Sequence, residues 1–242
     1  MRLIASFKRF FLRNRYIFLF FISFLIWIVL FRLLDTYYRV HTVDVVGLSG
    51  SDRIIGVVQL QNAHIWFIDE EQIQKNIQTA NPSYDVKEIK KIYPNTLVIN
   101  VRRLYPSAYL KIGDGYILLS KEGNIIQKDR IIIQKLVPLI NYYQNISHST
   151  YKSGNIIDKK DIRDALYFLE VVKSTKEKVL RIDIAGYHML GLYTKDHEYI
   201  FSSEKERELQ MYQYEQFLKQ FQIQGTKFRG IDFRFDKPVV KF

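Results

Sequence analysis

The feature that most constrains this chain is a run of sixteen residues, Tyr16 to Phe31, in which Ser23 is the only polar side chain. A helix needs roughly 20 apolar residues to cross a hydrocarbon layer of ~30 Å, at ~1.5 Å per residue. Residues 16–34 supply 19 positions, provided that the side chain of Arg32 reaches the interface. The sequence therefore predicts a membrane-spanning helix over 16–34, with membrane lipid as its partner.

A cleaved secretory leader would also combine a basic start with an apolar run. Two features favour an uncleaved anchor: the run is longer than the usual core of a leader, and no small-residue cleavage site follows it in residues 32–38. Five basic residues and no acid lie in residues 1–15. The positive-inside rule therefore predicts a cytoplasmic basic tail over 1–15 and a single-pass topology with an extracytoplasmic C-terminus.

The formal net charge of +11 first suggests a nucleic-acid partner, but its distribution argues against one. Residues 1–39 hold seven basic residues and one acid, so more than half of the excess lies in the tail and around the span. Anionic lipid attracts such cations by ~1 kcal/mol each, which explains them without another partner. Neither a nucleic acid nor a small-molecule substrate is expected. The absence of cysteine excludes disulfides, thiol nucleophiles and iron–sulfur clusters.

Residues 35–110 have the patterning of a small α+β domain. Alternating apolar residues predict strands near 43–46, over 86–93 and over 97–102, the last with Leu97, Ile99 and Val101 on its buried face. Ser51 and Asp69 are placed to cap two helices between the first strand and the second. The predicted order is β-α-α-β-β.

Residues 111–242 have the patterning of a mixed β-domain with an antiparallel-rich sheet and two helices. The predicted elements are a hairpin over 115–127, a helix over 161–172, strands over 179–184, 190–193 and 199–201, a long helix capped by Ser203 and Glu206, and a terminal strand over 230–242. Residues 141–155 are expected to form a surface loop. The whole chain is predicted to be α+β.

The first domain resembles the POTRA domain of the FtsQ/DivIB family of bacterial cell-division proteins. The resemblance rests on Val43-x-Val45-x-Gly47, on Ala63 to Asp69, and on Tyr93-Pro94-Asn95-Thr96-Leu97 followed by Arg102 to Ala108. The last stretch resembles a v-E-R-x-P-x-A ending in which Arg102 replaces the glutamate. The second domain continues the resemblance through the hairpin over 115–127, Leu136 to Pro138, and the ending over 231–236, which is similar to v-D-L-R-y-d.

This resemblance implies a non-enzymatic scaffold at the division septum that links other single-pass division proteins, FtsB/FtsL-like or DivIC-like. A terminal strand offers unpaired backbone groups that a partner's strand can extend. The resemblance places partner contact at Arg234, Phe235 and Lys237, with Phe235 as the apolar anchor. The structural alternative is that Phe235 packs in the core while the two cations are solvated. Pro238 suits an edge strand because it lacks a backbone donor.

Two other function classes remain as alternatives. An anchored enzyme would need a catalytic constellation, but the five histidines are dispersed and no H-E-x-x-H, G-x-S-x-G, S-x-x-K or phosphate-binding loop occurs. No catalytic, metal or cofactor-binding residue is therefore predicted, and no cofactor. A POTRA-containing accessory of membrane-protein insertion or secretion is the second alternative, although such proteins usually carry several POTRA units and this chain shows a single one.

Overall fold

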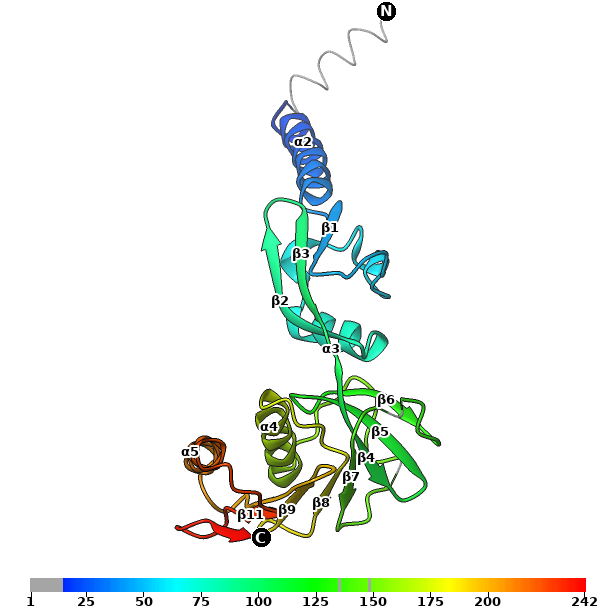
Figure 1. Cartoon of the computed structure of the whole chain (residues 1–242). Helices are drawn as coiled ribbons and strands as arrows, with labels where there is room; N and C mark the ends of the chain where they lie inside the picture. The colour runs from blue at the N-terminus through cyan, green and yellow to red at the C-terminus, as the bar shows by residue number, and fades with distance from the viewer. Residues whose placement is uncertain (1–14, 135, 148) are drawn as a thin grey trace, which may run out of the picture.

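The computed structural model describes residues 15–134, 136–147 and 149–242. Within these residues the chain is α+β, with an N-terminal apolar helix, a three-stranded sheet and a nine-stranded mixed sheet. The helix projects from one end of the small sheet's domain, and the large sheet's domain follows at the opposite end (Figure 1). The predicted fold class is therefore confirmed in its coarse form.

The N-terminal helix α2, Arg15–Tyr37, is long and apolar enough to cross a membrane. The qualifying segment is Leu19–Tyr37, none of which is buried in the protein, and no other helix of the described residues qualifies. The helix continues three residues beyond the predicted span of 16–34. The predicted cytoplasmic tail falls almost entirely on residues 1–14, which lie outside the described residues.

The small sheet has the strand order β1-β3-β2. Its strands are β1 Thr42–Val46, β2 Tyr84–Ile92 and β3 Thr96–Arg103, with β1 parallel and β2 antiparallel to β3. Leu97, Ile99 and Val101 are buried, as the alternation in β3 predicts. Helix α3, Glu70–Ala80, packs beside β2 and begins at the predicted cap, where the Asp69 carboxylate accepts a hydrogen bond from the Gln72 N–H at 3.1 Å.

The helix predicted after Ser51 is wrong, because the described residues 47–69 contain only two 3-10 turns, η1 Val58–Leu60 and η2 Ile65–Phe67. Gly56 has a φ of 96°, which a right-handed helix cannot include. The Asn81 side chain also binds both the N–H and the carbonyl of Ile55, at 2.8 and 2.9 Å. The backbone groups that a helix would use are therefore committed to a side chain 26 residues away.

The large sheet has the order β12-β11-β10-β9-β8-β7-β4-β5-β6. Its strands are β4 Pro106–Ile112, β5 Gly115–Ser120, β6 Ile125–Asp129, β7 Leu139–Tyr142, β8 Arg181–Ile184, β9 Leu190–Tyr193, β10 Glu198–Phe201, β11 Gly230–Asp232 and β12 Val239–Lys241. Five of its eight neighbouring pairs are antiparallel, so the predicted antiparallel-rich mixed sheet is confirmed. Residues 106–110, which the sequence places in the first domain, belong to this second sheet.

Two helices accompany the large sheet, as predicted. Helix α4, Lys160–Ser174, buries its apolar stripe in the core of this domain, and α5, Arg207–Gln224, joins it through an ion pair between Arg207 and the buried Asp164. The predicted capping box at Ser203 is wrong. Helix α5 starts at Arg207, and its N-cap residue Glu206 makes no side-chain hydrogen bond to the helix. The Ser203 hydroxyl is buried without a hydrogen-bond partner.

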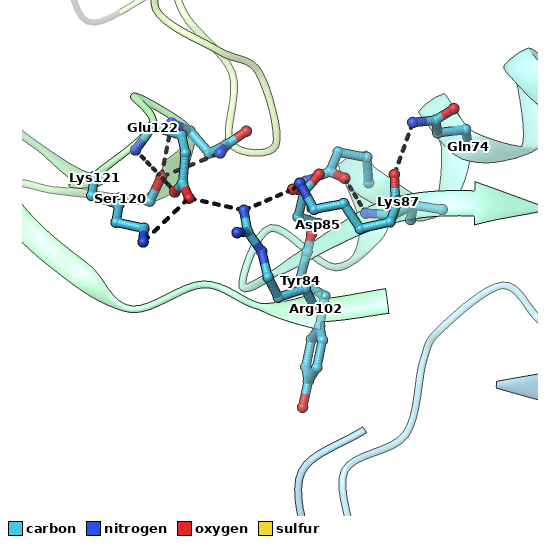
Figure 2. A network of polar contacts seen from close by, with 11 residues as sticks. Gln74, Tyr84, Asp85, Lys87, Arg102, Ser120, Lys121 and Glu122 are labelled. Carbon is cyan, nitrogen blue, oxygen red and sulfur yellow. Dashed lines mark hydrogen bonds and ion pairs between the residues drawn. The ribbon is translucent and has the colours of Figure 1, made fainter. Parts of the chain in front are cut away.

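One arginine links the two domains at their junction. Arg102, near the end of β3, forms ion pairs with Asp85 of β2 at 3.2 Å and with Glu122 of the β5–β6 turn at 2.9 Å. Figure 2 shows its guanidinium between the two carboxylates, with Lys87 on the far side of Asp85 and Lys121 beside Glu122. Arg102 therefore has an acidic partner in each of the two domains.

Candidate partner-binding surface at the C-terminal hairpin

The C-terminal hairpin forms one edge of the large sheet. Strand β11 pairs in parallel with β10, and β12 folds back antiparallel to β11. No strand lies outside β12 in the part of the chain that the structure describes. One side of the β12 backbone is therefore available to a further strand.

The terminal strand predicted over 230–242 is wrong in its extent, because the chain bends at residues 234–237 and returns. Asp232 ends β11 and accepts a hydrogen bond from the Arg234 N–H at 3.1 Å, a side-chain bond that stabilises a turn. Pro238 stands immediately before β12, where its missing donor costs no ladder bond. Pro238 therefore does not lie within an edge strand as predicted, but directly before the edge strand β12.

Arg234 lies in this bend and forms an ion pair with Asp232. Its Nε donates to Oδ1 of Asp232 at 2.9 Å and its Nη2 to Oδ2 at 2.7 Å, which makes a two-pronged ion pair. Burial alone would raise the pKa of the Asp232 carboxyl, but hydrogen bonds from the Arg234 side chain and backbone outweigh it and hold that pKa below its usual value. The side-chain hydrogen bonds to Asp232 also raise the pKa of Arg234. Arg234 thus stabilises the turn of the hairpin, and its side chain is also partly open to solvent.

Phe235 points out of the protein, with 51% of its surface exposed, whereas Ile231 and Phe233 are fully buried. The structural alternative, in which Phe235 packs in the core, is therefore excluded. The guanidinium carbon of Arg234 lies 5.7 Å from the centre of the Phe235 ring. Lys237 is exposed two residues further on. The three residues predicted for partner contact are thus grouped on one exposed bend.

Two residues that the sequence analysis did not single out hold this bend in place. The Nζ of Lys205 donates to the carbonyls of Phe233 and Phe235, at 3.2 and 2.7 Å. The Nε2 of Gln213, on α5, donates to the carbonyl of Asp236 at 2.8 Å. These bonds join side chains to backbone carbonyls that lie 23 to 30 residues away along the chain, so no local pattern in the sequence could reveal them.

Further apolar side chains extend the exposed surface along β12. Val239 is half-exposed and Phe242 is largely exposed, so both stand with Phe235 on the outside of the hairpin. Lys241 of β12 forms an ion pair with Glu198 of β10 at 3.1 Å. We call the surface formed by Phe235, Lys237, Val239 and Phe242 the hairpin edge.

The hairpin edge has features that suit binding by strand addition. It offers an unpaired strand, three exposed apolar side chains and one exposed cation, Lys237, which suit an extended segment of another protein. Among the described residues, no group of three or more histidine, aspartate or glutamate side chains is arranged to hold a metal ion.

A scan against protein-family models and a search of curated proteins find no match to the chain.

Proposed function

We propose that this protein is a non-enzymatic, membrane-anchored scaffold of the bacterial division machinery, of the FtsQ/DivIB type. It recruits other single-pass division proteins through the hairpin edge. The observation that carries the proposal is that β12 ends the large sheet with its outer side unpaired and with Phe235, Val239 and Phe242 exposed beside it. The motifs of the sequence supply the family, and this surface supplies the mode of binding.

Helix α2 anchors the scaffold in this proposal. Its qualifying segment of 19 residues extends about 28 Å, close to the thickness of a hydrocarbon layer. The basic residues of the sequence before it favour a cytoplasmic N-terminus in this proposal, with both sheets outside the cytoplasm.

The first domain is a POTRA domain in this proposal, with its strand order β1-β3-β2 and its helix α3 beside the sheet. It departs from the expected β-α-α-β-β order because 3-10 turns replace the first helix. The close approach of Gly47 to β3 supports the V-x-V-x-G motif as a structural requirement, since a Cβ there would lie 1.9 Å from the carbonyl oxygen of Val101.

Binding occurs by β-augmentation, in which a partner's strand pairs with β12 and gains main-chain hydrogen bonds. Phe235 provides an apolar anchor at the end of that strand, and Lys237 provides a cation for an acidic neighbour on the partner. The clamps from Lys205 and Gln213 keep the bend rigid, which lowers the entropy lost on binding.

Capture of the full chain from membranes of dividing bacteria, through a tag on the N-terminus, tests this function. Removal of residues 239–242 deletes β12 but keeps the buried Ile231 and Phe233, so the rest of the domain retains its core. We expect single-pass division proteins to be captured by the intact chain and lost from this truncation and from Phe235→Ser. Tyr212→Ser, at an exposed aromatic residue of α5, is the matched control and keeps them. Capture of insertion or secretion components in their place would contradict the proposal.

A further inference from the structure

Exposed apolar side chains gather at the end of the first domain where α2 joins it. Phe67 is 84% exposed and Trp66 57%, although both follow the completely buried Ile65 in the turn η2. Tyr37, Ile92 and Tyr93 are also more than half exposed. We call the surface formed by Tyr37, Trp66, Phe67, Ile92 and Tyr93 the membrane-proximal rim.

Backbone hydrogen bonds hold the first loop of this rim against the end of α2. The Ile65 N–H donates to the carbonyl of Tyr38 at 3.0 Å, and Arg39 and His64 form an antiparallel bridge. The Trp66 ring lies 4.6 Å from the ring of Tyr38, centre to centre. Trp66 is therefore fixed beside the residue that directly follows the helix.

The second loop of the rim, the turn between β2 and β3, is held to the same stretch of chain. The Asn95 carbonyl accepts hydrogen bonds from the N–H groups of His41 and Thr42, at 2.9 and 3.3 Å. Figure 1 shows this turn at the end of the domain from which α2 departs. The Nζ of Lys91 donates to the Ile68 carbonyl at 2.7 Å and so connects the two loops. The rim is one surface around the base of the helix.

The position of the rim follows from the helix. The apolar segment ends at Tyr37, one residue before the hydrogen-bonded loops begin, so the rim lies at the depth where hydrocarbon gives way to lipid headgroups. Tryptophan and tyrosine rings favour that layer because one part of each ring system is apolar and another carries a polar group. The only carboxylate of this last helical turn, Asp35, is paired with Arg39 at 2.6 Å.

We infer that the membrane-proximal rim inserts into the interfacial layer of the bilayer that α2 spans, so that the first domain rests on the membrane surface instead of swinging on the helix. This inference rests on the membrane anchoring in the proposed function. The occupant of the surface is lipid, because the rim is covalently joined to the end of α2 and therefore stays close to the bilayer that α2 spans.

The two tryptophans of the chain allow a direct test with the full-length protein in phosphatidylcholine–phosphatidylglycerol vesicles. Trp27 precedes Tyr37 by ten residues, which places it about 15 Å deeper, near the bilayer centre. Trp27→Phe leaves Trp66 as the only tryptophan, and Trp66→Phe leaves Trp27. Fluorescence is quenched with lipids that are spin-labelled either at the headgroup or deep in the acyl chain, and with iodide from the water.

We expect the headgroup label to quench Trp66 more than the deep label does, the order to be reversed for Trp27, and both to be protected from iodide. Iodide quenching of Trp66 together with deep-label quenching of Trp27 would overturn the insertion of the rim into the interfacial layer but would support the membrane anchoring by α2. The rim would then be free to bind a protein. Failure of the deep label to quench Trp27 would overturn the anchor as well.

Two variants complete the test. In the Trp27→Phe background, Phe67→Ser with Tyr93→Ser should weaken headgroup quenching of Trp66 and expose it to iodide, and unchanged quenching would refute a shared rim surface. Both side chains are exposed, so the core of the domain is retained. Tyr212→Trp in a chain without the natural tryptophans is the matched control, because its exposed position on α5 lies in the second domain. It should be quenched by iodide and by neither lipid label.

Discussion

Two phenylalanines of the C-terminal hairpin, Phe233 and Phe235, differ sharply in their surroundings. Phe233 is completely buried and stacks on Phe201 with ring centres 5.0 Å apart, whereas Phe235 is exposed. Phe233→Ala should lower the free energy of unfolding by ~3–5 kcal/mol because it leaves a cavity. Phe235→Ala should change it by less than ~0.5 kcal/mol but abolish partner capture. Urea unfolding of the two variants in detergent checks the first difference, and equal losses of stability would contradict it.

The ion pair between Asp232 and Arg234 makes the hairpin sensitive to acid. The pKa of Asp232 is lower in the folded chain than in the unfolded chain. The stabilisation is therefore complete above the unfolded pKa of ~3.9 and is lost as the pH falls through the lower folded pKa.

Arg234→Gln should consequently lower the free energy of unfolding by ~1–3 kcal/mol at neutral pH, because it leaves the buried carboxylate without its charged donor. The difference from the unaltered chain should shrink as the pH falls below ~4. Urea unfolding at a series of pH values measures it, and a difference that is the same at every pH would show that Arg234 acts by packing alone.

At the scale of the elements, a single buried amide organises the segment that the sequence predicts to be helical. Asn81 donates to the carbonyls of Ile55 and Ile77 and accepts from the Ile55 N–H. Asn81→Ala should cost ~1–3 kcal/mol of stability and accelerate hydrogen exchange over residues 51–60, since the Ile55 groups lose their partners. Asn76→Ala, on the exposed side of α3, is the control and should stay within ~0.5 kcal/mol. Unchanged exchange in the Asn81 variant would contradict this role.

Most elements with a clear local pattern could be predicted from the sequence. The alternation of Leu97, Ile99 and Val101 and the stripe of α4 report a buried face directly, and the apolar run of α2 reports a helix long enough to cross a membrane. The elements that could not be predicted depend on distant partners. Strand β7 has only four residues and is defined by parallel pairing with β4 and β8, and the segment after Ser51 is shaped by Asn81.

The same distinction applies to the candidate site. The resemblance named Arg234, Phe235 and Lys237, and they do lie together on one exposed bend. The alternation of Ile231, Phe233 and Phe235 nevertheless suggested one continuous strand. The turn made by Asp232 and Arg234 and the clamp from Lys205 depend on three-dimensional contacts, which the alternation cannot encode.

At the scale of the whole molecule, the Arg102 ion pairs are one of the contacts that join the two domains, and Gly154 of the second domain also packs closely against Gln78 of α3. Its ion pairs with Asp85 and Glu122 are partly exposed, so Arg102→Ala should change the free energy of unfolding by less than ~1 kcal/mol. It should instead broaden the distribution of distances between the domains. Arg102→Glu should broaden it further, because three carboxylates would then repel one another.

The lack of natural cysteines makes this measurement direct, since cysteines introduced at the exposed Asn76 and Tyr212 can be spin-labelled selectively. Pulsed electron resonance then gives the distance distribution between α3 and α5. Lys87→Ala is the control because Lys87 pairs with Asp85 within the first domain. A distribution as narrow as that of the unaltered chain in both Arg102 variants would show that the junction is held by other contacts.

The proposed function requires that this membrane-anchored chain gathers at the division site. The most direct test is fluorescence microscopy of the full chain in dividing bacteria, with the fluorescent protein on the N-terminus so that β12 stays free. We expect the intact chain to form a band at mid-cell, and we expect this band to be lost when the Arg234-Phe235 region is altered or the first domain is removed. A uniform membrane signal throughout division would contradict it.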